Sequence, residues 1–252
     1  NNLNNINPES LKSESFRNKL VLIKADIFIV VAYKILPSSL INIPKYGSLN
    51  LHASLLPKYR GAGPIQWALM NGDKVTGVTI FQIKRKIDTG NILFQQQIKI
   101  KKDDNMQTLG MRLCEIGADS MLSVLKNIEE QKVDSSPQNS DGISLAPKIT
   151  KEMLIINWSW AAKKIHNWIR GLSPYPGMHT FFKNKKVRIF KTKVIEGLGE
   201  KGVIVSLDKK SCIIGTGDQL ISILEIQLEG KKKMDIRDFL MGSTFKKGNV
   251  LG

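Results

Sequence analysis

The spacing of apolar residues divides the chain into two regions of different character. In the first region, apolar runs with the length of buried strands cover 25–33, 47–53, 77–83 and 91–100. Helical spacing predicts helices at 11–23, 65–71 and 110–131 and a helical turn over 38–43. Strands that alternate with helices indicate an α/β unit. The run 25–33 is apolar on both faces, which is typical of the middle of a parallel sheet.

The second region begins after a polar stretch. Residues 132–147 are rich in Ser, Pro, Asp and Gly, as linkers are. A short helix is expected at 159–171, followed by short strands at 187–195, 202–207, 211–217 and 219–230. Small strands at this spacing indicate a compact barrel. The pattern therefore predicts an α/β domain at 1–133, a linker at 134–149 and a small β-barrel domain at 150–252.

The net charge of the chain indicates what kind of partner it binds. The formal net charge is +16, and residues 146–252 alone hold 20 Lys and Arg against 9 Asp and Glu, a surplus of +11. Such a surplus favours a polyanionic partner, RNA or DNA ahead of a membrane surface, although Lys, Asn and Ile are abundant throughout and a lysine-biased composition is the alternative. No apolar run is long enough to span a membrane. Cys114 and Cys212 fit free thiols in a reducing cytoplasm better than a disulfide.

Candidate chemistry appears in the strand 47–53. Asn50 and His52 are two residues apart and share one face of that strand, near the end where open α/β sheets bind ligands. The Asn50 amide can stabilise an oxyanion, and the His52 imidazole can move a proton near neutral pH. Asp88, in the turn 84–90, is the best candidate for a carboxylate that orients the ring. The set predicts acyl transfer in which the substrate's own nucleophile attacks a bound carbonyl.

Other kinds of site fit less well. Ser54 lies outside any G-x-S-x-G pattern, and the three histidines lack metal-ligand spacing, so neither a serine nucleophile nor a metal is expected. A polar pair packed in the core is the structural alternative for the two strand residues. The loop that follows favours a ligand, because Gly61 and Gly63 allow close backbone approach. Residues 55–57 add an apolar wall suited to a flat heterocycle.

Several runs together resemble a known family. The run 50-NLHASLLPKYRGAGPIQWALMNGD-73, with 76-TGVTIFQI-83 and 88-DTGNIL-93, resembles the 10-formyltetrahydrofolate-dependent formyltransferases. The later runs 145-LAPKITKEMLIINW-158, 173-SPYPG-177 and 186-KVRIFK-191 are similar to the branch of that family that acts on methionyl initiator tRNA. The resemblance covers nearly the whole chain. It implies a partial Rossmann-like formyltransferase domain followed by a small OB-like β-barrel domain.

The resemblance also implies roles for individual residues. Asn50, His52 and Asp88 match the family's catalytic trio. The family's formyl donor is 10-formyltetrahydrofolate, its partner is methionyl initiator tRNA, and a cytoplasmic monomer without metal is expected. Four residues match the folate-binding loop: Ser54, Leu55, Leu56 and Pro57. Five basic residues are expected to meet the tRNA: Lys58, Arg60, Lys185, Lys186 and Arg188.

The chain departs from the family pattern in three places. The family's first strands, which precede 25–33, have no counterpart, so exposed apolar strand surface is expected. The run 31-VAYKILP-37 lacks a glycine and one residue of the usual pattern, and Lys86 stands where glycine is common. Two alternatives stay open: a folate-dependent formyltransferase acting on a small amine, either a nucleotide or an amino sugar, and a non-catalytic tRNA-binding remnant.

Overall fold

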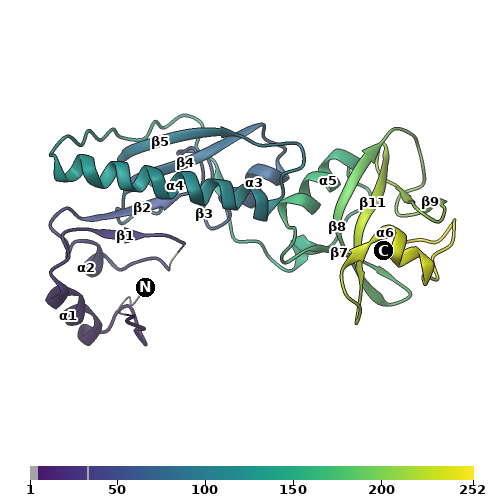
Figure 1. The fold of residues 1–252 in the computed structure, drawn as a ribbon, viewed down its shortest axis with the longest axis horizontal. Helices are drawn as coiled ribbons and strands as arrows, with labels where there is room; N and C mark the ends of the chain where they lie inside the picture. Colours follow the sequence, from purple (N-terminus) through teal and green to yellow (C-terminus); the bar gives the residue numbers. More distant parts are fainter. Residues whose placement is uncertain (1–4, 33) are drawn as a thin grey trace. The chain divides into compact units, whose positions relative to one another are not determined.

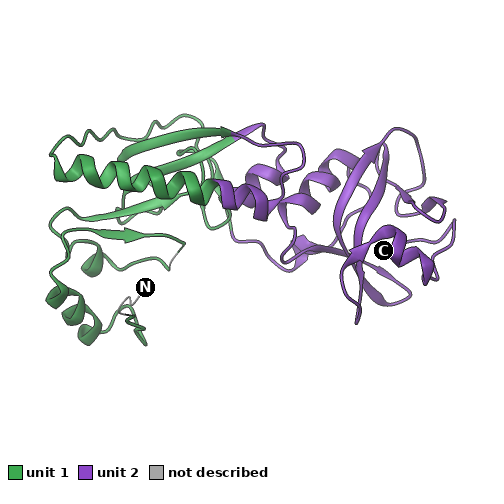
Figure 2. Ribbon diagram, in the orientation of Figure 1, with its two compact units in different colours: residues 1–64, 76–98, 113–147 green, residues 65–75, 99–112, 148–252 purple. Residues whose placement is uncertain are grey.

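The structure is a computed structural model that describes residues 5–32 and 34–252, and it contains two compact units (Figure 2). The first unit comprises the residues up to 64 together with 76–98 and 113–147. The second comprises 65–75, 99–112 and 148–252. Two short segments from the N-terminal half of the chain therefore belong to the C-terminal unit.

The first unit is built on a four-stranded sheet in the order β1-β2-β4-β5 (Figure 1). Its strands are β1 (Phe28–Val30), β2 (Ser48–His52), β4 (Val75–Gln82) and β5 (Ile92–Lys99). Strand β2 pairs parallel with β1 and antiparallel with β4. Leu49 and Ile80 from this sheet pack against Met121 and Val124 of α4 (Met106–Glu129). The helical spacing predicted for 110–131 therefore places an apolar stripe on the sheet.

Strand β1 differs from its prediction. The run 25–33 was expected to be a buried strand inside a parallel sheet, but β1 has three residues and lies at the sheet edge. Ile29 is 44% exposed and Val31 is 52% exposed, while residue 33 lies outside the described part. The prediction was wrong because apolar faces indicate that a strand is covered above and below the sheet, not that it has a partner strand along each edge. Among the described strands, β1 pairs with β2 alone. The apolar surface expected here is present.

Short elements complete the first unit. Helix α1 (Glu14–Ile23) begins where the Ser13 hydroxyl accepts a hydrogen bond from the Phe16 N–H, and α2 (Ser38–Ile41) is a single turn. Strand β3 (Arg60–Gly61) pairs parallel with β6 (Leu145–Ala146). Two-residue strands have no period to detect, so the sequence did not predict this pairing. It fastens the end of the polar stretch 132–147 to the loop that follows β2.

The second unit is built on a β-sheet against which the helices α5 (Ala162–Gly171) and α6 (Ile236–Met241) pack. The strand order is β7-β8-β11-β10-β9, and β12 (Met234–Asp235) also pairs with β11. The five ordered strands are β7 (Met178–Phe182), β8 (Lys185–Ile195), β9 (Ile204–Leu207), β10 (Cys212–Gly215) and β11 (Leu220–Leu228). Ile165 and Ile169 of α5 are fully buried in the core of this unit. The remaining elements are α3 (Pro64–Met70) and the 3-10 helix η1 (Glu152–Leu154).

The sheet of the second unit is open. Among the described residues, no strand pair joins β7 to β9, so the strands do not close into a barrel. The segment 249–252 instead contacts both edges: the Ile204 N–H donates to the Asn249 carbonyl (2.8 Å), and the Gly252 N–H donates to the Phe181 carbonyl (3.0 Å). Edges covered in this way are protected from pairing with other chains. The α/β class with a second, β-rich domain is confirmed.

Candidate active site

Asn50 and His52 lie on one face of β2, opposite Phe81 and Thr79 of β4. His52 is buried, with 6% of its surface exposed, whereas Asn50 is half-buried. Within residues 5–32 and 34–252, the Asn50 carboxamide makes no hydrogen bond. Because the Asn50 carboxamide is partly exposed and has no hydrogen-bond partner there, it is available to bind a ligand.

The His52 ring is held in one tautomer. Its Nε2 atom lies 2.8 Å from the carbonyl oxygen of Tyr59. A carbonyl oxygen only accepts, so Nε2 carries the proton, and Nδ1 of the neutral ring carries the lone pair. The Nδ1 atom lies 3.9 Å from Asp88 Oδ2, so Nδ1 faces a carboxylate. The ring is therefore arranged to accept a proton at Nδ1.

Asp88 is fixed by the backbone around it. Its φ of +51° lies in the left-handed region, which the short polar side chain of aspartate tolerates. The Gly61 N–H donates to Asp88 Oδ2 (2.8 Å). Gln138 Nε2 donates to the carbonyls of Asp88 and Gly90, both at 2.9 Å. These bonds hold the carboxylate beside His52.

Gln138 is a positioning residue that the sequence did not reveal. It lies in the polar stretch 132–147, where nothing in the local pattern distinguishes it from solvated linker residues. The Arg60 guanidinium donates to Gln138 Oε1 from Nε (3.2 Å) and from Nη2 (2.6 Å). Arg60, expected to meet tRNA, thus contacts the same residue that holds the Asp88 turn. Lys58 is exposed, and its side chain makes no hydrogen bond or ion pair among the described residues.

The loop after β2 is stiffened by polar side chains beneath it. The Ser54 hydroxyl donates to the Lys58 carbonyl (2.6 Å), and the Thr79 hydroxyl donates to the Ser54 carbonyl (2.6 Å). The Leu56 N–H in turn donates to Thr79 Oγ1 (3.1 Å). Ser54 and Leu56 are buried, so both shape the loop from within. Two residues of the predicted folate-binding loop keep partly exposed apolar side chains: Leu55 and Pro57.

The second unit contains the other predicted basic residues. Lys185 on β8 is exposed, and Lys186 and Arg188 on the same strand are partly exposed. Arg188 lies opposite His179 of β7. Burial lowers the pKa of His179, and the charges of Lys186 and Arg188 lower it further. The β7–β8 hairpin therefore presents a positive surface.

Neither a metal cluster nor a membrane span is found in the described part of the chain. No group of three or more His, Cys, Asp or Glu side chains gathers there as metal ligands would. No helix in the described ranges combines the length and the apolar character needed to cross a bilayer.

Gly90 offers a test of how tightly the Asp88 turn is packed. A Cβ atom at this position would lie 1.5 Å from the Gln82 carbonyl oxygen, so any side chain forces the backbone to move. We expect Gly90→Ala to lower the free energy of unfolding by about 2–3 kcal/mol, measured by urea denaturation. Gly242→Ala is the matched control, because its Cβ would meet open space. Equal effects of the two substitutions would contradict the tight packing.

Comparison with known proteins adds to this geometry. A family model described as "Formyl transferase" matches residues 2–125, and one described as "Formyl transferase, C-terminal domain" matches residues 148–244. A methionyl-tRNA formyltransferase from Thermodesulfovibrio yellowstonii is 44% identical over 242 residues, which cover 96% of this chain and 78% of that protein.

Solved structures share the fold. HypX from Aquifex aeolicus, in complex with tetrahydrofolic acid, matches with a TM-score of 0.69 and 21% identity, over 94% of this chain and 44% of that one. WlaRD, a sugar 3N-formyl transferase solved in the presence of dTDP and 5-N-formyl-THF, matches with a TM-score of 0.65 and 23% identity, over 84% of this chain and 77% of that one. At these identities the likeness concerns the fold alone.

Proposed function

The chain belongs to the formyl transferase family, and on that premise we propose that it moves the formyl group of 10-formyltetrahydrofolate to the α-amine of methionyl initiator tRNA. It is a one-carbon transferase, and its formyl donor is a formyltetrahydrofolate. One observation supports tRNA over a small amine as the acceptor. The 44% identity to a methionyl-tRNA formyltransferase extends over 96% of the chain, which includes the basic C-terminal region.

The geometry of the trio supports a direct transfer. The amine nitrogen bonds to the formyl carbon, and the carbonyl oxygen becomes negative. The free carboxamide of Asn50 donates a hydrogen bond to that oxygen. His52 Nδ1 accepts the proton that the amine loses, and Asp88 stabilises the imidazolium. When the bond from the formyl carbon to the folate nitrogen breaks, His52 gives the proton to that nitrogen.

The folate ring is proposed to rest on Leu55 and Pro57. Both side chains are apolar and partly exposed, and the backbone of their loop is held by Thr79. A flat, largely apolar ring needs such a wall beside a polar reacting end. Ser54 and Leu56 are buried, so they support the loop from inside and do not contact the folate ring.

The tRNA is proposed to bind the basic surface of the second unit. Residues 146–252 carry a surplus of +11, and their exposed cations attract a phosphate backbone. Lys185, Lys186 and Arg188 lie on this part of the chain, and Lys58 is exposed on the loop after β2. A tRNA substrate implies a cytoplasmic location. One chain contains the whole trio, so a monomer is sufficient.

A formylation assay tests the substrate. The purified chain is given 10-formyltetrahydrofolate with methionyl initiator tRNA, with a dTDP-linked amino sugar, or with an amino nucleotide. We expect kcat/KM for the tRNA to exceed that for either small amine by more than about 100-fold, because only the tRNA adds binding energy from its backbone. Faster transfer to the sugar or the nucleotide would contradict the proposal. Tight tRNA binding with no transfer to any amine would indicate the non-catalytic remnant.

A further inference from the structure

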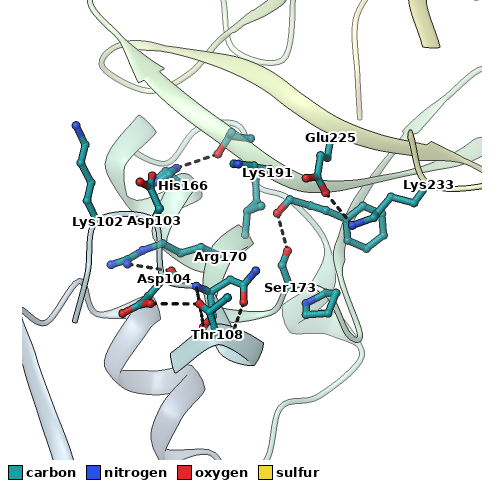
Figure 3. Close-up of a pocket in the computed structure, with 15 residues that line it drawn as sticks. Lys102, Asp103, Asp104, Thr108, His166, Arg170, Ser173, Lys191, Glu225 and Lys233 are labelled. Atoms are coloured by element: carbon teal, nitrogen blue, oxygen red, sulfur yellow. Dashed lines mark hydrogen bonds and ion pairs between the residues drawn. The ribbon is translucent and has the colours of Figure 1, made fainter. Parts of the chain in front are cut away.

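The second unit contains a cavity whose wall is formed by its own residues, most of them polar or charged. The cavity has a volume of about 220 Å³. Segment 102–108, α5, β8, β11 and Lys233 contribute to the wall (Figure 3). A single water needs roughly 10–15 Å³ by this measure, so the cavity has room for a larger polar group.

Some charges of this cavity neutralise one another. Lys233 Nζ lies 2.8 Å from Glu225 Oε2. Asp104 Oδ2 lies 2.5 Å from Nη1 of Arg112. Glu225 and Asp104 are thus each engaged in an ion pair, and Asp104 also stabilises part of the charge of Arg170. Asp103 is the one other acidic residue of the wall. Among the described residues, three cations of the wall form no ion pair: Lys102, Arg170 and Lys191.

Arg170 has donors to spare. Its Nε donates to Asn167 Oδ1 (3.0 Å) and its Nη1 donates to the Asp104 carbonyl (3.3 Å). A guanidinium has five N–H donors, and the described residues account for two of them. Burial lowers the pKa of Arg170, and the nearby charge of Asp104 opposes that shift. An anion in the cavity would further stabilise the charge of Arg170 and would accept hydrogen bonds from its unused N–H groups.

His166 lines the same cavity, so its protonation depends on the charges around it. Its Nδ1 is 3.0 Å from the hydroxyl of Thr192, and the ring lines the cavity. Burial lowers its pKa, the charges of Arg170 and Lys102 act in the same direction, and Asp103 opposes them. Lys191 faces the cavity from β8 beside Thr192. An anion placed among these cations would raise the pKa of His166 and favour its protonated form.

We infer that this cavity binds one phosphate group of the RNA backbone, held by Arg170, Lys102 and Lys191. The inference rests on the proposed function, because the RNA is its substrate. Planar guanidinium groups recognise phosphate through paired N–H donors, and lysines add point charges. Free phosphate has the same chemistry, so the test has separate arms for the two sources.

The first arm uses inorganic phosphate. The chain has three histidines, so the His166 ring signal can be assigned by NMR and followed during a phosphate titration. We expect phosphate to shift this signal and raise its titration midpoint, with affinity increasing as the pH falls below the ordinary histidine value of 6.5. Lys191→Ala should weaken phosphate binding about 5-fold. Lys209→Ala removes an equal charge from an exposed turn outside the cavity and should change nothing.

The second arm uses initiator tRNA at several salt concentrations. Lys191→Ala is expected to lower tRNA affinity several-fold and to reduce the slope of log K against log salt by about 0.7–0.9, the loss of one phosphate contact. Lys19→Ala, which removes an equal charge from the exposed surface of α1 in the first unit, should leave the slope unchanged. The inference would be overturned if phosphate changed neither the position nor the titration midpoint of the His166 signal. It would also be overturned by phosphate binding combined with an unchanged tRNA slope in Lys191→Ala, since the cavity would then take free phosphate only.

The two proposals fail separately. If the chain binds tRNA with a Lys191-dependent slope but does not formylate it, the cavity assignment stands and the proposed function is wrong. If the chain formylates methionyl initiator tRNA and the slope does not depend on Lys191, the cavity assignment is wrong and the function stands.

Discussion

Replacing His52 by alanine is expected to lower kcat for formyl transfer by about 10²–10⁴-fold, because the amine then loses its proton without a base. The ring accepts that proton at Nδ1, 3.9 Å from Asp88 Oδ2, while Nε2 is occupied by the Tyr59 carbonyl. Affinity for tRNA should change little, since His52 is buried and the basic surface lies on other residues. The measurement is single-turnover transfer at saturating substrate, with tRNA binding measured alongside.

A second variant separates the loss of the base from the loss of the hydrogen bond to Tyr59. His52→Ala also leaves the Tyr59 carbonyl without its donor, which destabilises the loop. His52→Gln supplies an amide N–H of similar reach but no basic ring nitrogen. We expect both variants to lose transfer to a similar extent, with His52→Gln closer to the wild-type melting temperature. Near-normal transfer in a folded His52→Gln protein would contradict the role of His52 as a base.

Replacing Asn50 by alanine is expected to lower kcat by about 10²–10³-fold, the usual effect of removing one oxyanion donor. The Asn50 carboxamide has no hydrogen-bond partner among the described residues, so its loss breaks no contact within the protein. The free energy of unfolding should therefore stay within about 0.5 kcal/mol of wild type, measured by urea denaturation.

Kinetics distinguish the proposed role of Asn50 from simple substrate binding. An interaction made only in the transition state lowers kcat and kcat/KM equally, whereas uniform binding raises KM alone. Asn50→Asp keeps the shape but puts a negative charge where the oxyanion forms, so it should be at least as damaging as Asn50→Ala. A raised KM with unchanged kcat would show that Asn50 binds the donor without stabilising the oxyanion.

Part of this site was predictable because it follows local rules. Side chains alternate along a strand, so Asn50 and His52 had to share a face of β2. The glycine-rich loop and the turn that contains Asp88 were also visible in the sequence. Their meeting was not derivable from spacing alone. It depends on the Gly61 N–H and on Gln138, which bind Asp88 and its turn from two other segments.

The rest depends on contacts between distant parts of the chain. Strand β1 looked like an interior strand because apolar composition reports hydrophobicity and not the number of neighbours. Met70 of α3 belongs to the same core as Ile165 of α5, so segment 65–75 packs with the C-terminal unit. The hydrophobic pattern of α3 does not specify which sheet it covers. The small β-domain was predicted from its strand spacing, but the open edges bridged by 249–252 were not.

The most direct test of the account is a crystal structure of this chain with an analogue of 10-formyltetrahydrofolate that cannot transfer its formyl group. We predict the formyl oxygen within about 2.7–3.1 Å of the Asn50 amide nitrogen, with the formyl carbon facing His52 Nδ1 and the ring against Leu55 and Pro57. A formyl group bound away from Asn50 and His52, with its carbon closer to other side chains, would contradict the account.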